Sequence, residues 1–319
     1  MELASGAETA VHQCLDLHPE ESCAIVTDDE RLSIGRALYE AAAAVTEDAV
    51  LLTYPPGDEH GEEPPDPVAG AIAASDAFLA PTTKSISHTR ARSDATDAGV
   101  RGATLPGITE AIFERGLDAD YDRIKATCER VHEAVAGAEE IRVTSPAGTD
   151  IVVEPGDREW QLDTGSVQEP GTFSNLPAGE VFLSPETATG RYVVDGTTQP
   201  YGLLEEGQTL AFEVEDGYVT DIEDDRIRET VTGAAEAVGE SAYNLAELGI
   251  GTNAAVSELV GSVLLDEKAA GTVHFAIGDD AGIGGDTDAP IHLDGVIREP
   301  SVTADGEEIE LPAPNAADI

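Results

Sequence analysis

The segment Gly-Thr-Val-His-Phe-Ala-Ile-Gly-Asp-Asp-Ala-Gly-Ile-Gly-Gly-Asp-Thr-Asp-Ala-Pro-Ile-His-Leu-Asp, residues 271–294, decides how the second half of the chain is interpreted. His274 lies in a β-branched run that predicts a strand. A loop rich in glycine and aspartate follows, and His292 and Asp294 then lie two residues apart on a second predicted strand. Side chains at positions i and i+2 of a strand point to the same face. His292 and Asp294 can therefore bind one ion together, with His274 reaching it from a neighbouring strand.

Around this segment, the second half of the chain is rich in predicted strands and turns. Strands are expected at residues 140–144, 149–154, 190–195, 209–215 and 218–223. The last two are joined by Asp216-Gly217, a dipeptide typical of hairpins. One helix is predicted at residues 225–238. The pattern predicts a β-rich, mainly antiparallel α+β domain over residues 138–319, and this domain carries the candidate metal ligands.

The first half alternates short apolar strands with helices. Strands are predicted at residues 23–27, 49–54, 77–80 and 100–105, and helices at 32–45, 68–75, 89–98 and 121–136. Alternation of this kind requires right-handed crossovers and indicates a parallel sheet with helices on both faces. Residues 1–137 are therefore expected to form a parallel, three-layer α/β domain.

Polar loops follow the predicted parallel strands, where α/β domains bind ligands. His60 lies in one of these loops, and Ser85, Ser87 and His88 lie in the next. A histidine in a polar loop is often only solvated, and for His88 a contact with substrate is the alternative. The chain has no GxGxxG sequence after its first strand and no phosphate-binding P-loop, so a nucleotide cofactor is not expected.

The charge of the chain is strongly negative. Its 319 residues include 64 aspartates and glutamates against 17 lysines and arginines, a formal net charge of -47, and the lysines are only Lys84, Lys125 and Lys268. Hydrophobic periodicity runs through the whole chain, so the acid is spread over a folded surface. This composition resembles that of proteins adapted to a salt-rich cytoplasm, where screening weakens self-repulsion. It excludes nucleic acid and anionic membranes as expected partners, because both need clustered positive charge.

Localisation and redox state are inferred from what the sequence contains. No apolar run approaches the roughly 20 residues that cross a bilayer, and the amino terminus resembles no export signal. A soluble, cytoplasmic protein is therefore expected. Cys14, Cys23 and Cys128 have no metal-binding spacing, and we expect them to be buried, small apolar residues in a reducing compartment.

Three glutamates complete the set of candidate ligands. Glu180 lies where a turn enters an apolar strand, Glu247 lies in an otherwise small and apolar stretch, and Glu267 lies seven residues before His274. A carboxylate in apolar surroundings is costly unless a cation pairs with it. Together with His274, His292 and Asp294, these residues suit one or two divalent ions such as zinc, cobalt or manganese. Glu180 and Glu267 also have a simpler interpretation, as a charged strand end and a solvated helix end, and Glu267 is alternatively a base beside the metal.

Four motifs resemble those of the thermophilic metalloaminopeptidase (aminopeptidase T) family, in its shorter, archaeal-type subgroup. They are Asn-Leu-Pro-Ala-Gly-Glu-Val-Phe at 175–182, Ala-Glu-Leu-Gly-Ile-Gly-Thr-Asn at 246–253, Asp-Glu-Lys-Ala-Ala-Gly-Thr-Val-His-Phe-Ala-Ile-Gly at 266–278 and Pro-Ile-His-Leu-Asp-Gly at 290–295. The resemblance implies a two-ion site with metal ligands at Glu180, Glu247, His274, His292 and Asp294, and it makes Glu247 the bridging carboxylate. It also implies a general acid/base or a further ligand at Glu267.

The activity expected from this resemblance is hydrolysis of the amino-terminal residue of peptides. Two ions would hold a hydroxide of lowered pKa, and Glu267 would pass its proton to the leaving amine. A homodimer is also expected from the resemblance. The chain departs from the family in being shorter and in lacking the tyrosine that follows the first motif histidine, since Asp279-Asp280-Ala281-Gly282 stands there.

Two other functions remain open. Some relatives of this fold resemble mononuclear iron(II) dioxygenases that cleave hydroxylated pyridine rings, for which His274, His292 and Asp294 would supply the two-histidine, one-carboxylate triad and His88 the base. Glu180 and Glu247 are more carboxylates than such a site needs. The third alternative is a non-catalytic protein that binds a metal or a small molecule.

Overall fold

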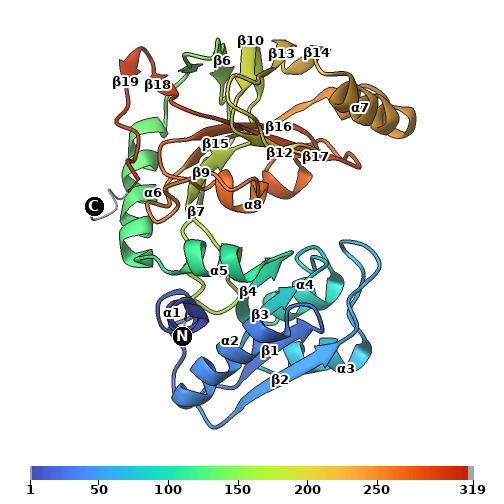
Figure 1. The fold of residues 1–319 in the computed structure, drawn as a ribbon, viewed down its shortest axis with the longest axis vertical. Helices are drawn as coiled ribbons and strands as arrows, with labels where there is room; N and C mark the ends of the chain where they lie inside the picture. Colours follow the sequence, from blue (N-terminus) through green and yellow to red (C-terminus); the bar gives the residue numbers. More distant parts are fainter. Residues whose placement is uncertain (1, 315–319) are drawn as a thin grey trace. The chain divides into compact units, whose positions relative to one another are not determined.

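A computed structural model describes residues 2–314 of the chain. The chain divides into two compact units, one made of Met1–Lys125 with Thr164–Ala178 and the other of Ala126–Asp163 with Gly179–Ile319. Figure 1 labels the elements of both units. No helix within residues 2–314 is long and apolar enough to span a membrane.

The first unit contains a five-stranded parallel sheet in the order β2-β1-β3-β4-β8. Its strands are β1 (Cys23–Asp28), β2 (Ala49–Tyr54), β3 (Ala77–Thr82), β4 (Arg101–Pro106) and β8 (Phe173–Asn175). The helices between them are α2 (Leu32–Val45), α3 (Asp66–Ala73), α4 (Arg90–Asp97) and α5 (Glu110–Leu117), preceded by α1 (Glu2–Thr9) and a π-helical turn, η1 (Ala10–Cys14). Strand, helix and strand thus follow one another as the sequence predicts.

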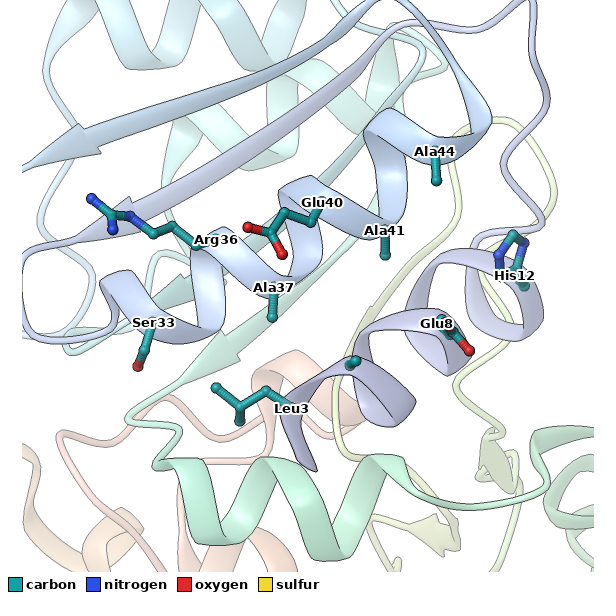
Figure 2. A pocket seen from close by; sticks show the side chains of 10 residues that line it. Leu3, Glu8, His12, Ser33, Arg36, Ala37, Glu40, Ala41 and Ala44 are labelled. Atoms are coloured by element: carbon teal, nitrogen blue, oxygen red, sulfur yellow. The ribbon is translucent and has the colours of Figure 1, made fainter. Parts of the chain in front are cut away.

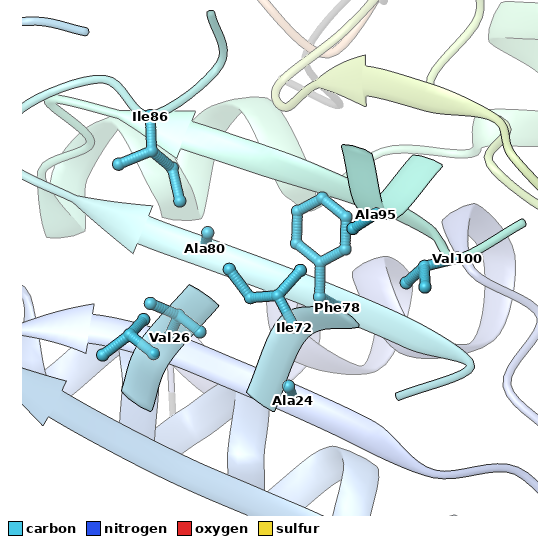
Figure 3. Close-up of a cluster of buried hydrophobic side chains, with 9 residues drawn as sticks. Ala24, Val26, Ile72, Phe78, Ala80, Ile86, Ala95 and Val100 are labelled. Atoms are coloured by element: carbon cyan, nitrogen blue, oxygen red, sulfur yellow. The ribbon is translucent and has the colours of Figure 1, made fainter. Parts of the chain in front are cut away.

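Both faces of this sheet are covered by helices, because its strands are apolar on both sides. Figure 3 shows the cluster on one face, where Ile72 of α3 and Ala95 of α4 lie over Val26 and Phe78. On the other face, α2 packs close to β1, and a Cβ at Gly35 would lie only 2.7 Å from Cγ2 of Thr27. Glycine at this position allows the helix to approach the strand.

The second unit contains two seven-stranded sheets. The first has the order β14-β13-β10-β6-β5-β18-β19 and the second the order β12-β11-β17-β16-β15-β9-β7. The first sheet comprises β5 (Ile141–Thr144), β6 (Asp150–Glu154), β10 (Thr187–Val194), β13 (Leu210–Glu215), β14 (Tyr218–Ile222), β18 (Ser301–Ala304) and β19 (Glu307–Glu308). The second comprises β7 (Gln161–Asp163), β9 (Glu180–Leu183), β11 (Thr197–Thr198), β12 (Gly202–Leu203), β15 (Leu245–Gly251), β16 (Val273–Gly278) and β17 (His292–Ile297). All their pairings are antiparallel.

The two antiparallel sheets pack against each other through aromatic rings. Tyr192 of the first sheet stacks on Phe212 at 4.5 Å between ring centroids, and it contacts Phe275 of the second sheet at 5.1 Å. The remaining elements of this unit are α7 (Asp225–Val238), α8 (Val263–Asp266) and two 3-10 turns, η2 (Gly239–Tyr243) and η3 (Ala281–Ile283). Helix α6 (Tyr121–Val135) contains the point where the first unit ends and the second begins.

The predicted fold class is confirmed, with a parallel α/β part followed by a β-rich part. The units divide the chain differently from the single boundary expected after residue 137. Residues 164–178 return to the first unit because β8 pairs with β4, and a three-residue strand carries no pattern that predicts such a return. Cys14, Cys23 and Cys128 are all buried, as expected.

Candidate metal centre

Strand register places the five predicted ligands on one face of the second antiparallel sheet. Directly paired residues share a face, and so do residues two apart on one strand. Asp294 pairs with Ala276 of β16, which lies two residues from His274. Gly249 of β15 pairs with His274, and Gly251 pairs with Glu180. Glu180, Glu247, His274, His292 and Asp294 therefore project from four adjacent strands to the same side.

The opposite face of this sheet is apolar, and its Phe275 packs on the other sheet. Alternation along β16 thus buries Phe275 in the core while turning His274 toward the carboxylates. A Cβ at Gly249 would lie 2.0 Å from Cε1 of His274, so the missing side chain provides the space that the imidazole fills.

His274 connects two of the glutamates. Its Nε2 atom lies 3.2 Å from Oε1 of Glu247 and 3.7 Å from Oε2 of Glu180. All three side chains are buried, with His274 only 1% exposed. Their ligand atoms lie within 4.8 Å of one another, a spacing that can hold a metal ion.

His292 connects Glu247 to Asp294. Its Nε2 atom lies 3.2 Å from Oε2 of Glu247 and 3.4 Å from Oδ1 of Asp294. Its Nδ1 atom lies 2.7 Å from the backbone oxygen of Asp279. A proton on Nδ1 donated to this carbonyl leaves Nε2 free to bind a metal, the usual arrangement for histidine ligands. Glu247, His292 and Asp294 also lie within 4.8 Å of one another.

A lysine lies among the carboxylates. The Nζ atom of Lys268 is 2.9 Å from Oε1 of Glu180 and 2.6 Å from Oε1 of Glu267. Lys268 is 3% exposed, and its pKa is raised well above the ordinary value because Glu180 and Glu267 outweigh the effect of burial. Glu267 in turn lies within 4.8 Å of His274 and Asp294.

The carboxylates favour positive charge on both histidines. Burial disfavours the imidazolium of His274, but the hydrogen bond to Glu247 and the surrounding negative charges raise its pKa to about 9. Burial also disfavours the imidazolium of His292. Asp294 and Glu247 outweigh this effect and raise the pKa of His292 to about 12. The cluster therefore attracts cations, and a bound metal ion would take the place of these protons.

The buried glutamates differ in their affinity for protons. Burial raises the pKa of Glu267 to about 8, with Asp294 and Glu180 adding to the effect and Lys268 opposing it. Burial also acts to raise the pKa of Glu247, but hydrogen bonds from His274 and His292 overcome it and hold that pKa well below its ordinary value. At neutral pH Glu247 is thus a carboxylate, whereas Glu267 can hold a proton.

Two buried polar atoms of the cluster suit a metal centre. Oε2 of Glu180 and Nδ1 of His274 have no hydrogen-bond partner among the described residues. Buried polar atoms are normally satisfied, so an unsatisfied carboxylate oxygen directed at a histidine is a suitable position for a ligand. Within residues 2–314, side chains spaced to hold a metal ion occur only in this cluster.

A groove in the first unit differs from this cluster in its chemistry. It has a volume of about 460 Å³ and lies between α1 and α2, as Figure 2 shows. Ala37, Ala41 and Ala44 line it on α2, and the exposed acids Glu8 and Glu40 flank them. His12, Ser33 and Arg36 also line the groove, but none of its residues belongs to a group spaced to hold a metal ion among residues 2–314.

The structure brings together six of the seven residues that the sequence singled out. Glu180, Glu247, Glu267, His274, His292 and Asp294 form the cluster; metal binding by these residues stays a prediction. His88 lies in the first unit, in the loop between β3 and α4. Sequence reasoning missed Lys268, because a lysine directly after a glutamate is typical of a solvated helix end.

The loop after β16 is held by Asp280. This carboxylate is 3% exposed and accepts hydrogen bonds from Oγ of Ser184 at 2.9 Å, Nδ2 of Asn244 at 2.8 Å and the backbone N of Thr287 at 2.6 Å. Asp280 thus occupies the region where the aminopeptidase resemblance leads one to expect a tyrosine. By ordering this loop it also supports Asp279, whose carbonyl orients His292.

The fold and the cluster define a class of protein: a two-unit α/β protein with a candidate divalent-metal centre on one face of an antiparallel sheet. The sequence model of the NicX family, 2,5-dihydroxypyridine 5,6-dioxygenase, matches residues 7–311. The chain belongs to this family. No curated protein matches the sequence.

Two solved structures share the fold. The structure of 2,5-dihydroxypyridine dioxygenase from Pseudomonas putida KT2440 matches with a TM-score of 0.78 at 18% identity, covering 99% of this chain and 97% of that one. Wild-type AmpT from Thermus thermophilus matches with a TM-score of 0.65 at 19% identity, covering 97% of this chain and 99% of that one. The resemblance to the aminopeptidases is therefore supported at the level of fold, whereas family membership supports the dioxygenase that was the alternative.

Proposed function

We propose that this protein is a mononuclear iron(II) dioxygenase that opens a hydroxylated pyridine ring. The observation that carries the proposal is the match to the 2,5-dihydroxypyridine 5,6-dioxygenase family over residues 7–311. This match favours the dioxygenase over the aminopeptidase that the four sequence motifs first suggested. The fold shared with the Pseudomonas putida dioxygenase is consistent with it.

The donor set of the cluster fits one iron(II) ion. His274, His292 and Asp294 supply two imidazoles and one carboxylate, the combination that leaves open positions on iron in oxygenases. The metal would supply the redox chemistry that ring cleavage by dioxygen requires. Asp279 would hold the tautomer of His292 through its backbone oxygen, 2.7 Å from Nδ1. Oε1 of Glu247 lies 3.2 Å from Nε2 of His274 and Oε2 lies 3.2 Å from Nε2 of His292, so Glu247 would hold both imidazoles before iron binds and would add negative charge beside the bound ion.

A base is needed to take the proton of a ring hydroxyl, and we assign this role to His88. It lies in the loop that follows β3, at the carboxyl ends of the parallel strands, where α/β domains bind ligands. Glu267 is less suited, because its Oε1 is engaged by Lys268 at 2.6 Å. Replacement of His88 by asparagine should lower the rate while leaving the iron content unchanged.

The proposal is tested with protein loaded anaerobically with iron(II) and mixed with 2,5-dihydroxypyridine and oxygen. Oxygen uptake should match the loss of ring absorbance, one molecule of oxygen for each ring opened. His274→Ala and Asp294→Ala should each lower the rate roughly 100-fold or more, whereas His18→Ala, which changes an exposed histidine of the first unit, should keep it. Absence of oxygen uptake with hydroxylated pyridines in iron-loaded protein would contradict the proposal.

The aminopeptidase remains the second candidate because of two observations. Glu180 and Glu247 add two buried carboxylates to the triad, and the fold is shared with AmpT. Release of amino acids from short peptides by zinc-, cobalt- or manganese-loaded protein would favour this function, and Glu267→Gln should then keep the metal but lose turnover. Metal binding without either activity would favour a non-catalytic binding protein.

A further inference from the structure

Lys268 is the buried cation of the candidate metal centre. Its ammonium lies 2.9 Å from Glu180 and 2.6 Å from Glu267, and the side chain is 3% exposed. In proteins each of these carboxylates could instead bind a divalent ion. The ammonium thus occupies the space between two of the oxygens to which an ion would bind.

Backbone hydrogen bonds fix the position of Lys268. Its carbonyl accepts a hydrogen bond of 2.8 Å from the N of Asn253, and its own N donates to the oxygen of Leu265 at 3.1 Å. Gly251 permits this approach, because a Cβ there would lie 2.1 Å from the oxygen of Ala269. Asp266, two residues before Lys268, is fully buried and accepts hydrogen bonds from Thr197, Val260 and Gly261. The position of the ammonium is therefore built into the fold.

The two oxygens of Glu180 have different surroundings. Oε1 contacts Lys268 at 2.9 Å, whereas Oε2 has no hydrogen-bond partner among residues 2–314 and lies 3.7 Å from Nε2 of His274. Glu180 thus lies between the lysine and the histidines. One side of the cluster already has its cation, and the other side, with Glu247, His274, His292 and Asp294, can accept one.

Charge balance agrees with this division. The cluster contains four carboxylates, from Glu180, Glu247, Glu267 and Asp294. One ammonium and one divalent ion bring three positive charges to these groups, of which Glu267 can hold a proton, whereas a second ion beside the ammonium would bring five positive charges to at most four negative ones in a buried site. Without the ammonium, two divalent ions would balance the four carboxylates, and buried charge is tolerated only when it is compensated in this way.

We propose that Lys268 takes the place of a second metal ion, so that the centre holds one divalent ion, and that removal of the ammonium converts it into a two-ion centre. The inference rests on the proposed metal site but not on the proposed reaction. Lys268 would thereby decide between the two-ion site implied by the aminopeptidase resemblance and the single-ion site of the proposed dioxygenase.

The experiment measures bound Mn²⁺ per chain in the wild type, Lys268→Ala and Lys268→Met. Metal-free protein is saturated with Mn²⁺ and desalted in high salt, which weakens binding of ions to exposed carboxylates. Elemental analysis should give one ion per chain for the wild type and two for both variants. Electron paramagnetic resonance should change from the signal of an isolated Mn²⁺ ion to that of an exchange-coupled pair.

Two matched variants serve as controls. Lys268→Arg keeps a cation in the cluster and should retain one ion, whereas Lys125→Ala changes an exposed lysine and should not alter the metal content. Two ions in the wild type would overturn the inference, and so would one ion in both folded variants. A variant that is unfolded without metal should fold when Mn²⁺ is present, and failure of Mn²⁺ to restore its circular dichroism would also contradict the inference.

The outcomes separate this inference from the proposed function. One Mn²⁺ in the wild type and two in Lys268→Ala, without oxygen uptake by the iron-loaded protein, would support the role of Lys268 and contradict the dioxygenase. Oxygen uptake by the wild type, with one ion in every variant, would support the dioxygenase and contradict the role of Lys268.

Discussion

At the scale of single residues, Gly249 shows how the candidate metal centre depends on a side chain that is missing. Gly249 faces His274 across the pairing of β15 with β16, and the ring occupies the volume that a Cβ would need. The neighbouring Leu248 and Ile250 point to the apolar core instead. The position of the imidazole is therefore set by strand register together with one glycine.

Gly249→Ala should displace His274, because the new Cβ would lie 2.0 Å from Cε1 of the ring. We expect the variant to lose about 1–3 kcal/mol of unfolding free energy through overpacking and to bind divalent metal at least about tenfold more weakly. Chemical denaturation and calorimetric titration with Mn²⁺ measure the two effects. Gly233→Ala is the matched control, since a Cβ on this residue of α7 has no neighbour within 4 Å and should be neutral or stabilising. Unchanged metal affinity in Gly249→Ala would refute this role of the glycine.

The sequence was sufficient to identify the cluster but not its cation. His292 and Asp294 are two residues apart on a strand, and this spacing predicts a shared face whatever the surroundings. The function of Lys268 depends on the turn after α8, which brings it to Glu180 from 88 positions away in the chain. Local periodicity contains no information about that contact, so the buried ammonium became visible only in the structure.

At the scale of elements, one buried ion pair joins the start of the parallel sheet to the helices before it. Arg101, the first residue of β4, donates two hydrogen bonds to Glu21, 2.7 and 2.8 Å long, and others to the backbone oxygen of Leu15 after η1. The Arg101 side chain is only 6% exposed. Arg101 holds the pKa of Glu21 below its ordinary value, and hydrogen bonding to His18 adds to this.

Glu21→Gln should destabilise the first unit by about 1–3 kcal/mol at neutral pH, because the buried guanidinium loses its charged partner. The pKa of Glu21 is lowered in the folded state, so its contribution is present above the ordinary value of 4.5 and disappears as the pH falls through the folded pKa. The difference between wild type and variant should therefore shrink as the pH is lowered below about 5. Urea unfolding of both proteins from pH 7 to pH 3 measures this difference in the free energy of unfolding. Glu20→Gln, at an exposed neighbouring position, should show no such difference, and a Glu21 effect that does not vary with pH would contradict the assignment.

The elements themselves were largely predictable. Helices α2 and α7 have the bounds that the periodicity predicted, and β2 does as well. The short strands β8, β11 and β12 were not predicted, because two or three residues carry no usable period. Their pairing depends on neighbours distant in the chain, and this is also why the return of residues 164–178 to the first unit escaped sequence analysis.

At the scale of the whole molecule, the formal net charge of -47 on 319 residues has to be accommodated by the folded state. The ion pairs of its arginines are mostly exposed, such as Arg142 with Asp150 and Arg191 with Glu213. Exposed pairs add little stability, so they cannot offset the repulsion among the many remaining carboxylates. Unfolding separates these charges, and self-repulsion therefore lowers the stability of the folded protein at low ionic strength.

Raising KCl from 0.1 to 1 M should increase the melting temperature, because the Debye length falls from about 10 to about 3 Å and the surface carboxylates no longer repel one another over the distances between them. We expect a rise of at least about 4 °C, which corresponds to about 1–2 kcal/mol for a protein of this size. Differential scanning calorimetry across the salt series measures it. The double variant Glu229→Gln/Glu236→Gln removes two exposed charges from α7 and should melt higher than the wild type in 0.1 M KCl, with a smaller gain at 1 M. A melting temperature that is constant or falls with KCl would show that repulsion among surface carboxylates does not limit the stability of this fold.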